Sequence, residues 1–126
     1  MAQAATPVLD QVRFDDFASL FDAAELRDVI EEWRVDSATA LDAIAVARAR
    51  DDHTAIGELA HRAGGGGLAL GATAFAHACE HLRKTAASGG PVTDPDVAAV
   101  RAAVDAAHAA MSNAANSAPQ AQPKNP

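Results

Sequence analysis

The sequence is poor in cysteine and in aromatic residues, with one Cys, one Trp and no Tyr among 126 residues. The lone Cys79 excludes an intramolecular disulfide, and without a CxxC pair no structural zinc site is expected. Aromatic residues make up 4% of the chain, and β-branched residues are too sparse for a large sheet. No run of about 18 apolar residues occurs, so no membrane-spanning helix is expected.

Positive charge is also scarce, because 10 Lys and Arg face 17 Asp and Glu and give a net charge of −7. Binding to nucleic acid or to an anionic membrane needs a basic surface that displaces counterions, so neither is expected as a partner. The N-terminus lacks the basic start and the apolar stretch of a signal peptide. The sequence therefore predicts a single domain located in the cytoplasm.

Alanine dominates what is present and supplies more than half of the apolar residues. It is the best helix former and adds little bulk between helix axes, so an all-α fold with closely packed helices is expected. Apolar residues recur at helical spacing in five successive segments, the second of them over 23–50. Short breaks separate the segments, with Asp51-Asp52 as an N-cap, a turn near Gly71 and a glycine-proline stop over 88–91.

Short connections between amphipathic helices predict an antiparallel four-helix bundle with a short N-terminal leader helix. The bundle is expected over 12–113, between an N-terminal tail over 1–11 and a C-terminal tail over 114–126. The C-terminal tail carries three prolines and no apolar residue larger than Ala, which predicts disorder. The expected inward stripes are, in chain order, Phe14, Phe17 and Phe21; Leu26, Val29, Ile30, Trp33, Ser37, Ala40, Leu41 and Ile44; Ile56, Leu59, Ala60, Ala63, Gly67 and Leu70; Phe75, Cys79 and Leu82; and Val97, Val100, Val104, Ala107 and Met111.

Four of the eight glycines are consecutive and lie inside the third apolar stripe, at 64–67. Each Gly costs about 1 kcal/mol relative to Ala within a helix, so some benefit must offset this cost. A flexible linker is one interpretation, but the apolar spacing continues through the glycines without a change of phase. A phosphate loop is another, but Ala72 stands where the Walker lysine would be and no strand precedes the segment. The third interpretation, a helix face kept bare for another surface, fits best.

His61 lies about 145° around the helix from the middle of the core stripe and therefore points outward. A surface histidine without a task is the simpler interpretation, but the surrounding glycines favour a functional one. An exposed imidazole offers a ring-nitrogen lone pair and is suited to act as a nucleophile. Leu in place of Gly64 or Gly65 is expected to spare helix stability and to hinder docking of a partner. The neighbours of His61 on this face are Gly57, Gly64 and Gly65 one turn away, and Thr54 and Leu68 two turns away.

The third and fourth helices resemble the histidine-containing phosphotransfer (HPt) domain of bacterial phosphorelays. The family pattern is His-x-Leu-Lys-Gly-Ser-Ala-x-x-Leu-Gly-Ala, often with a later Cys-x-x-Leu, and the resemblance covers roughly residues 12 to 112. It implies that His61 is the phosphoacceptor, that Gly65 clears space beside it, and that Leu70, Gly71 and Ala72 form the turn after the active helix. The matching residues are Ala60-His61-Arg62-Ala63-Gly64-Gly65-Gly66-Gly67-Leu68-Ala69-Leu70-Gly71-Ala72, followed by Phe75, Cys79 and Leu82.

The resemblance also implies a mechanism and partners. A receiver domain carrying an aspartyl phosphate and its own Mg²⁺ would dock on the glycine face, and Nε2 of His61 would attack the phosphorus. The reverse step would load a second receiver domain. No cofactor of its own, no ATP site and no autokinase activity are expected, and the chain is expected to be a monomer. The residues expected to contact the partner are Thr54, Gly57, Arg62, Gly64, Gly65 and Leu68.

The sequence departs from the family pattern, because Ala63, Gly64 and Gly66 replace the usual Leu, Lys and Ser. The missing Lys removes a cation beside the phosphoryl group, and Arg62 or Arg83 is a candidate to replace it. The alternative function is a non-catalytic helical scaffold that binds receiver or kinase domains without efficient phosphorylation.

A third possibility is a metal- or haem-binding bundle. His77 and His81 have the i, i+4 spacing of a metal pair, but the His-Glu-x-x-His pattern is absent and no metal site is expected. Cys79 is expected in the core rather than as a reactive thiol.

Overall fold

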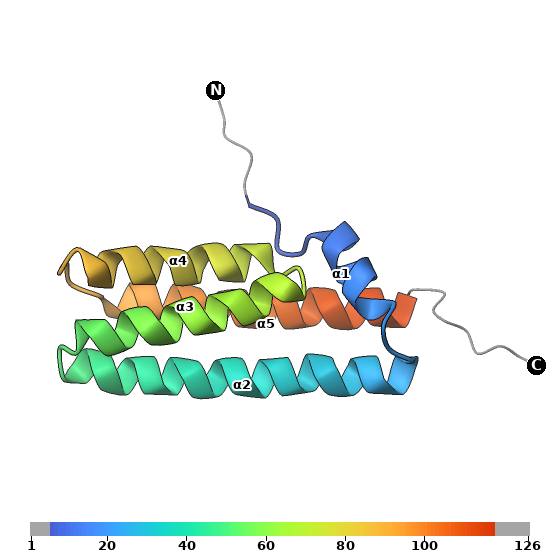
Figure 1. Ribbon diagram of the computed structural model, residues 1–126, viewed down its shortest axis with the longest axis horizontal. Helices are drawn as coiled ribbons and strands as arrows, with labels where there is room; N and C mark the ends of the chain where they lie inside the picture. The colour runs from blue at the N-terminus through green and yellow to red at the C-terminus, as the bar shows by residue number, and fades with distance from the viewer. Residues whose placement is uncertain (1–5, 118–126) are drawn as a thin grey trace, which may run out of the picture.

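The computed structural model describes residues 6–117, and within this range the chain forms five α-helices and no strand (Figure 1). The all-α prediction is therefore confirmed. Helices α2 to α5 form a four-helix bundle in which each helix packs against two neighbours, and the short α1 crosses one end of it (Figure 1). The helices are α1 (Gln11–Ala18), α2 (Ala23–Ala49), α3 (His53–Ala69), α4 (Thr73–Ala87) and α5 (Asp94–Ser117).

Ion pairs show that α2 and α5, which are far apart in sequence, run antiparallel. Arg48 near the end of α2 contacts Asp94 at the start of α5. Two turns further along α5, Nη2 of Arg101 donates to Oδ1 of Asp42 at 3.0 Å. Residue numbers thus fall on α2 as they rise on α5, as the bundle prediction requires.

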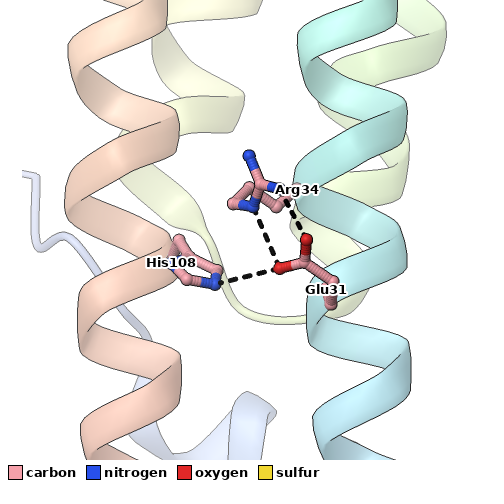
Figure 2. Close-up of polar contacts among 3 residues, drawn as sticks. All are labelled: Glu31, Arg34 and His108. Carbon is pink, nitrogen blue, oxygen red and sulfur yellow. Dashed lines mark hydrogen bonds and ion pairs between the residues drawn. The ribbon is translucent and has the colours of Figure 1, made fainter.

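A third polar contact between α2 and α5 involves Glu31, Arg34 and His108 (Figure 2). Nε of Arg34 donates to Oε1 of Glu31 at 3.0 Å, and Nε2 of His108 lies 3.7 Å from the same oxygen. The hydrogen bond from Arg34 lowers the pKa of the Glu31 carboxyl, and the charges of Arg34 and His108 act in the same direction. This cluster joins the two helices outside the apolar core.

Aspartate side chains begin α1, α2 and α3, because they accept from backbone N–H groups that have no partner within the first turn. Asp22 and Glu25 form a complete capping box at the start of α2. Asp52 caps α3 by accepting from the backbone of Ala55 at 3.1 Å, which confirms the predicted N-cap. The preceding Asp51 has a positive φ of 55°, which completes the tight turn from α2 to α3.

The predicted core stripes of α4 and α5 are buried as expected. An aromatic contact in the core joins α2 to α4, where Trp33 meets Phe75 edge-on with ring centroids 5.4 Å apart. Within residues 6–117, no helix has both the length and the apolar character needed to cross a bilayer. The leader helix is shorter than its phenylalanine spacing suggested, because α1 ends at Ala18 and Phe21 lies in the turn that follows.

The predicted C-terminal tail begins too early. Helix α5 continues to Ser117, and Ala114 and Ala115 pack against the core beside the leader helix. Alanine favours the helix, and this packing favours it further, so residues 114–117 are ordered although they contain no large apolar side chain. The rest of the predicted tail, 118–126, lies outside the described residues.

The predicted N-terminal tail over 1–11 is also wrong where the structure describes it. The backbone N–H of Asp10 donates to the carbonyl of Gly71 at 2.7 Å, and Oγ1 of Thr73 donates to the carbonyl of Pro7 at 2.7 Å. These hydrogen bonds tie the segment before α1 to the turn between α3 and α4. A pattern of apolar residues does not reveal backbone contacts of this kind, and residues 1–5 lie outside the described range.

Candidate functional site

Helix α3 runs without interruption through the glycine run, since residues 64–67 are helical and the helix ends at Ala69. The linker interpretation is therefore excluded. The phosphate-loop interpretation fails as well, because the segment is the middle of a helix rather than a loop after a strand. The break predicted near Gly71 is confirmed, and this glycine has a φ of +86° that side-chain-bearing residues rarely adopt.

The four glycines of the run face different surroundings. An ideal Cβ on Gly67 would lie 2.4 Å from a ring carbon of Phe75, and one on Gly64 would lie 3.0 Å from Cβ of Cys79. Both glycines therefore allow α4 to approach α3 closely. Cβ atoms on Gly65 and Gly66 would meet nothing within 4 Å, so these two positions face open space.

This arrangement corrects the expectation for Gly64, which is buried against α4 and does not belong to the bare face beside His61. The expected buried stripe of α3 was set by its larger apolar residues and did not include Gly64. Helix α3 also packs on α4 through small residues that carry little hydrophobic signal. The buried part of the α3 circumference is consequently wider than the predicted apolar stripe. Leu at position 64 would therefore lower the stability of the fold.

His61 is exposed on α3, as its helical position predicted. The exposed strip around it contains Thr54, Gly65 and Leu68. Leu68 is 41% exposed and offers an apolar contact on this surface. Gly57, one turn before His61, is half-buried and has only Cγ of Arg83 near its missing side chain, at 4.0 Å. With the exception of Gly64, the glycines next to His61 leave its flanks unobstructed.

An open groove of about 440 Å³ runs between α3 and α4 and includes His61. Gly57 on α3 and two alanines at the end of α4 add little bulk to its lining. Arg83 is the one guanidinium among its lining residues. The groove is lined by His53, Thr54, Gly57, Glu58, His61, Arg83, Ala86 and Ala87.

Arg83 is held in this groove by Glu80, one turn earlier on α4. Nε of Arg83 donates to Oε1 of Glu80 at 2.8 Å, and Nη2 donates to Oε2 at 2.5 Å. These hydrogen bonds lower the pKa of Glu80 and raise that of Arg83, and the charge of His61 lowers the pKa of Glu80 further. Sequence reasoning missed Glu80, although its i, i+3 spacing from Arg83 was a visible signal.

Arg62, the other candidate for the missing Lys, lies at a different place. It is exposed and lines a separate groove between α2 and α3, together with Asp36, Leu59 and Gly66. The two arginines therefore lie on opposite sides of the His61 strip. Only Arg83 shares a groove with the imidazole.

The remaining histidines and the cysteine do not gather into a second site. His77 is exposed, and His81 is 66% exposed with Nε2 3.9 Å from Oδ1 of Asp96. No group of three His, Cys, Asp or Glu that could hold a metal occurs among the residues that the structure describes. Cys79 is buried between α3 and α4, and burial raises the pKa of its thiol to about 12.

Comparisons with known proteins concern the family and the fold of this chain. The family model of the Hpt domain matches residues 28–110. The crystal structure of histidine-containing phosphotransfer protein B (HptB) from Pseudomonas aeruginosa PAO1 is similar, with a TM-score of 0.77 at 18% identity, over 89% of this chain and 97% of that chain. At this identity the similarity concerns the fold. No curated protein matches the chain.

Proposed function

Because the chain belongs to the Hpt domain family, we propose that it is a phosphorelay intermediate that carries a phosphoryl group on His61 between two receiver domains. The observation that supports this proposal best is the exposed imidazole on a continuous helix, with Gly57 and Gly65 on its flanks. A flat strip without bulky side chains lets a partner's active site close over the ring. A randomly placed surface histidine has no need of such neighbours.

The proposed chemistry is a direct transfer from an aspartyl phosphate. The lone pair on Nε2 of His61 attacks the phosphorus in line with the leaving carboxylate oxygen. The new N–P bond forms as the P–O bond breaks, and the aspartate leaves with the electron pair. The other ring nitrogen keeps its proton during the transfer. The reverse sequence loads the second receiver.

We propose that the receiver domain brings Mg²⁺, which neutralises charge on the transferred group when it is bound. This chain then contributes position and a nucleophile, so that it acts as a phosphocarrier and not as an autokinase. A single copy is expected to suffice, because α3 and α4 of one chain supply the whole face. The receiver is expected to rest on Thr54, Gly57, Gly65 and Leu68, with Arg62 at the edge.

Transfer of label from a receiver domain tests the proposal. The full chain is mixed with a ³²P-phosphorylated receiver and Mg²⁺, and we expect an acid-labile, alkali-stable label on the protein. The variant His61→Gln should take up no label, whereas the matched control His77→Gln, at an exposed position on α4, should be labelled like the wild type. Label retained by His61→Gln would refute the assignment. Binding of receivers without labelling of the wild type would favour the scaffold alternative.

A further inference from the structure

The family pattern has Lys at the position of Gly64 in this chain. On the side of α3 that faces α4, helix α3 therefore provides no cation next to His61. A phosphoryl group on nitrogen carries up to two negative charges, and a neighbouring cation stabilises it. We infer that Arg83, fixed in place by Glu80, binds the phosphoryl group carried by His61. This inference rests on the proposed function and names the residue that replaces the missing Lys.

The first support is placement. Arg83 extends from α4 into the groove that contains His61, and its Cγ lies 4.0 Å from the position where Gly57 would carry a Cβ. Gly57 precedes His61 by one helical turn, so the arginine stem lies about one turn from the imidazole along the same groove. A Cβ added at position 57 would be in ordinary van der Waals contact with this stem, whereas a longer side chain there would compete with it for the groove.

The second support is the count of hydrogen-bond donors. A guanidinium has five N–H donors in a rigid plane, and Glu80 occupies one on Nε and one on Nη2. Three donors, two of them on Nη1, are left for a phosphoryl oxygen. The carboxylate thus fixes the orientation of the guanidinium without using up its capacity. Arginine in this state loses little further side-chain freedom when it binds a phosphoryl group.

The other cations near α3 are less suited to the task. Arg62 lines the groove on the α2 side, as described above. His53 lies at the far end of the His61 groove, eight residues earlier on the same helix and therefore about 12 Å away along its axis.

Glu80 has two opposite effects on a bound phosphoryl group. It holds the guanidinium in place, but its own negative charge repels the phosphoryl oxygens. Two hydrogen bonds hold Arg83 against Glu80 and leave the remaining donors of the guanidinium available to the groove. We therefore expect the holding effect to exceed the repulsion. A neutral amide at position 80 removes the repulsion and weakens the hold on the guanidinium, so the change in transfer rate reveals which effect dominates.

The experiment measures the rate of transfer from a phosphorylated receiver to the full chain, and separately the half-life of the isolated phosphoprotein. Loss of a charge-assisted hydrogen bond costs about 10- to 100-fold, so Arg83→Gln should slow transfer by this factor. Arg83→Lys, which keeps the charge but loses the fixed fork, should recover part of the rate. Glu80→Gln should slow transfer about 3- to 10-fold, because one amide oxygen holds the guanidinium less firmly. The control Arg101→Gln, which removes an arginine that pairs with Asp42 on the α2–α5 side of the bundle, should transfer within about 2-fold of the wild type.

The outcomes separate this inference from the proposed function. Normal labelling of Arg83→Gln, while His61→Gln remains unlabelled, would overturn the role of Arg83 and leave His61 as the acceptor. Faster transfer by Glu80→Gln would overturn the holding role of Glu80. A defect in Arg83→Gln that Arg83→Lys does not relieve, together with a lowered melting temperature in both, would show that Arg83 acts only in packing. Labelling of the wild type at a residue other than His61 would instead refute the proposed function.

Discussion

Adjacent residues of the glycine run should respond in opposite ways to the same substitution. In Gly65→Leu the new side chain points into open space, because no atom lies within 4 Å of the added Cβ. Leu is a better helix former than Gly by about 0.8 kcal/mol, so the free energy of unfolding should rise by that amount. In Gly64→Leu the Cβ alone would lie 3.0 Å from Cβ of Cys79, and three further carbons would have to enter the contact between α3 and α4.

Overpacking of this kind typically costs about 1–3 kcal/mol, which exceeds the gain in helix propensity. Once the gain in helix propensity is subtracted, Gly64→Leu should therefore lower the free energy of unfolding by about 0.2–2 kcal/mol. The two variants carry the same substitution at neighbouring positions of α3. Any difference between the variants reports the side of the helix and not the chemistry of leucine.

Urea unfolding measures both values. Trp33 is the single tryptophan, and it is buried against Phe75, so its fluorescence reports the loss of the α2–α4 contact. Helicity by circular dichroism provides the second probe, and coincidence of the two transitions supports two-state analysis. Transfer assays on the same samples should show slow transfer to Gly65→Leu despite its higher stability, because the leucine stands in the proposed docking strip.

Two results would refute this reasoning. If Gly64→Leu were as stable as the wild type, α4 would not approach α3 as closely as the structure shows. If Gly65→Leu accepted phosphoryl groups at the wild-type rate, a bulky side chain beside His61 would not hinder the receiver, and the bare strip would have no role in docking.

Three further predictions concern other parts of the fold. Gly71→Ala should lower stability by about 1–2 kcal/mol in urea unfolding, because φ is +86° and the added Cβ would lie 2.8 Å from the carbonyl oxygen of Asp10. The pKa of Glu31 is lowered from 4.5, chiefly by the hydrogen bond from Arg34, so this pair stabilises the fold above about pH 4.5 and the contribution disappears as the pH falls through the lowered pKa. Thermal melts should therefore show Glu31→Gln slightly less stable than the wild type at pH 7, with the difference lost in acid, and a constant difference would contradict this. Cys79, whose pKa burial raises to about 12, should react with a thiol reagent only after unfolding, and rapid reaction of the native protein would show that the α3–α4 contact opens.

The sequence determined which segments are helical and how residues are arranged around each helix. Alanine content, apolar spacing and the polar caps gave five helices, and the inward stripe Val97, Val100, Val104, Ala107 and Met111 is buried as expected. The exposure of His61 followed in the same way, since a helix fixes the angle between any two of its residues. These are local properties, so one segment at a time was sufficient to derive them.

Only the tertiary structure decided how the helices face one another. Helix α4 covers Gly64, and a residue without a side chain gives no hydrophobic signal to predict this contact. Pro7 and Asp10 are ordered by hydrogen bonds to a turn more than 60 residues away in sequence. The inference that Arg83 and not Arg62 binds the phosphoryl group likewise depends on which neighbouring helix borders each side of α3. Helical periodicity gives directions within one helix, whereas distances between helices come from packing.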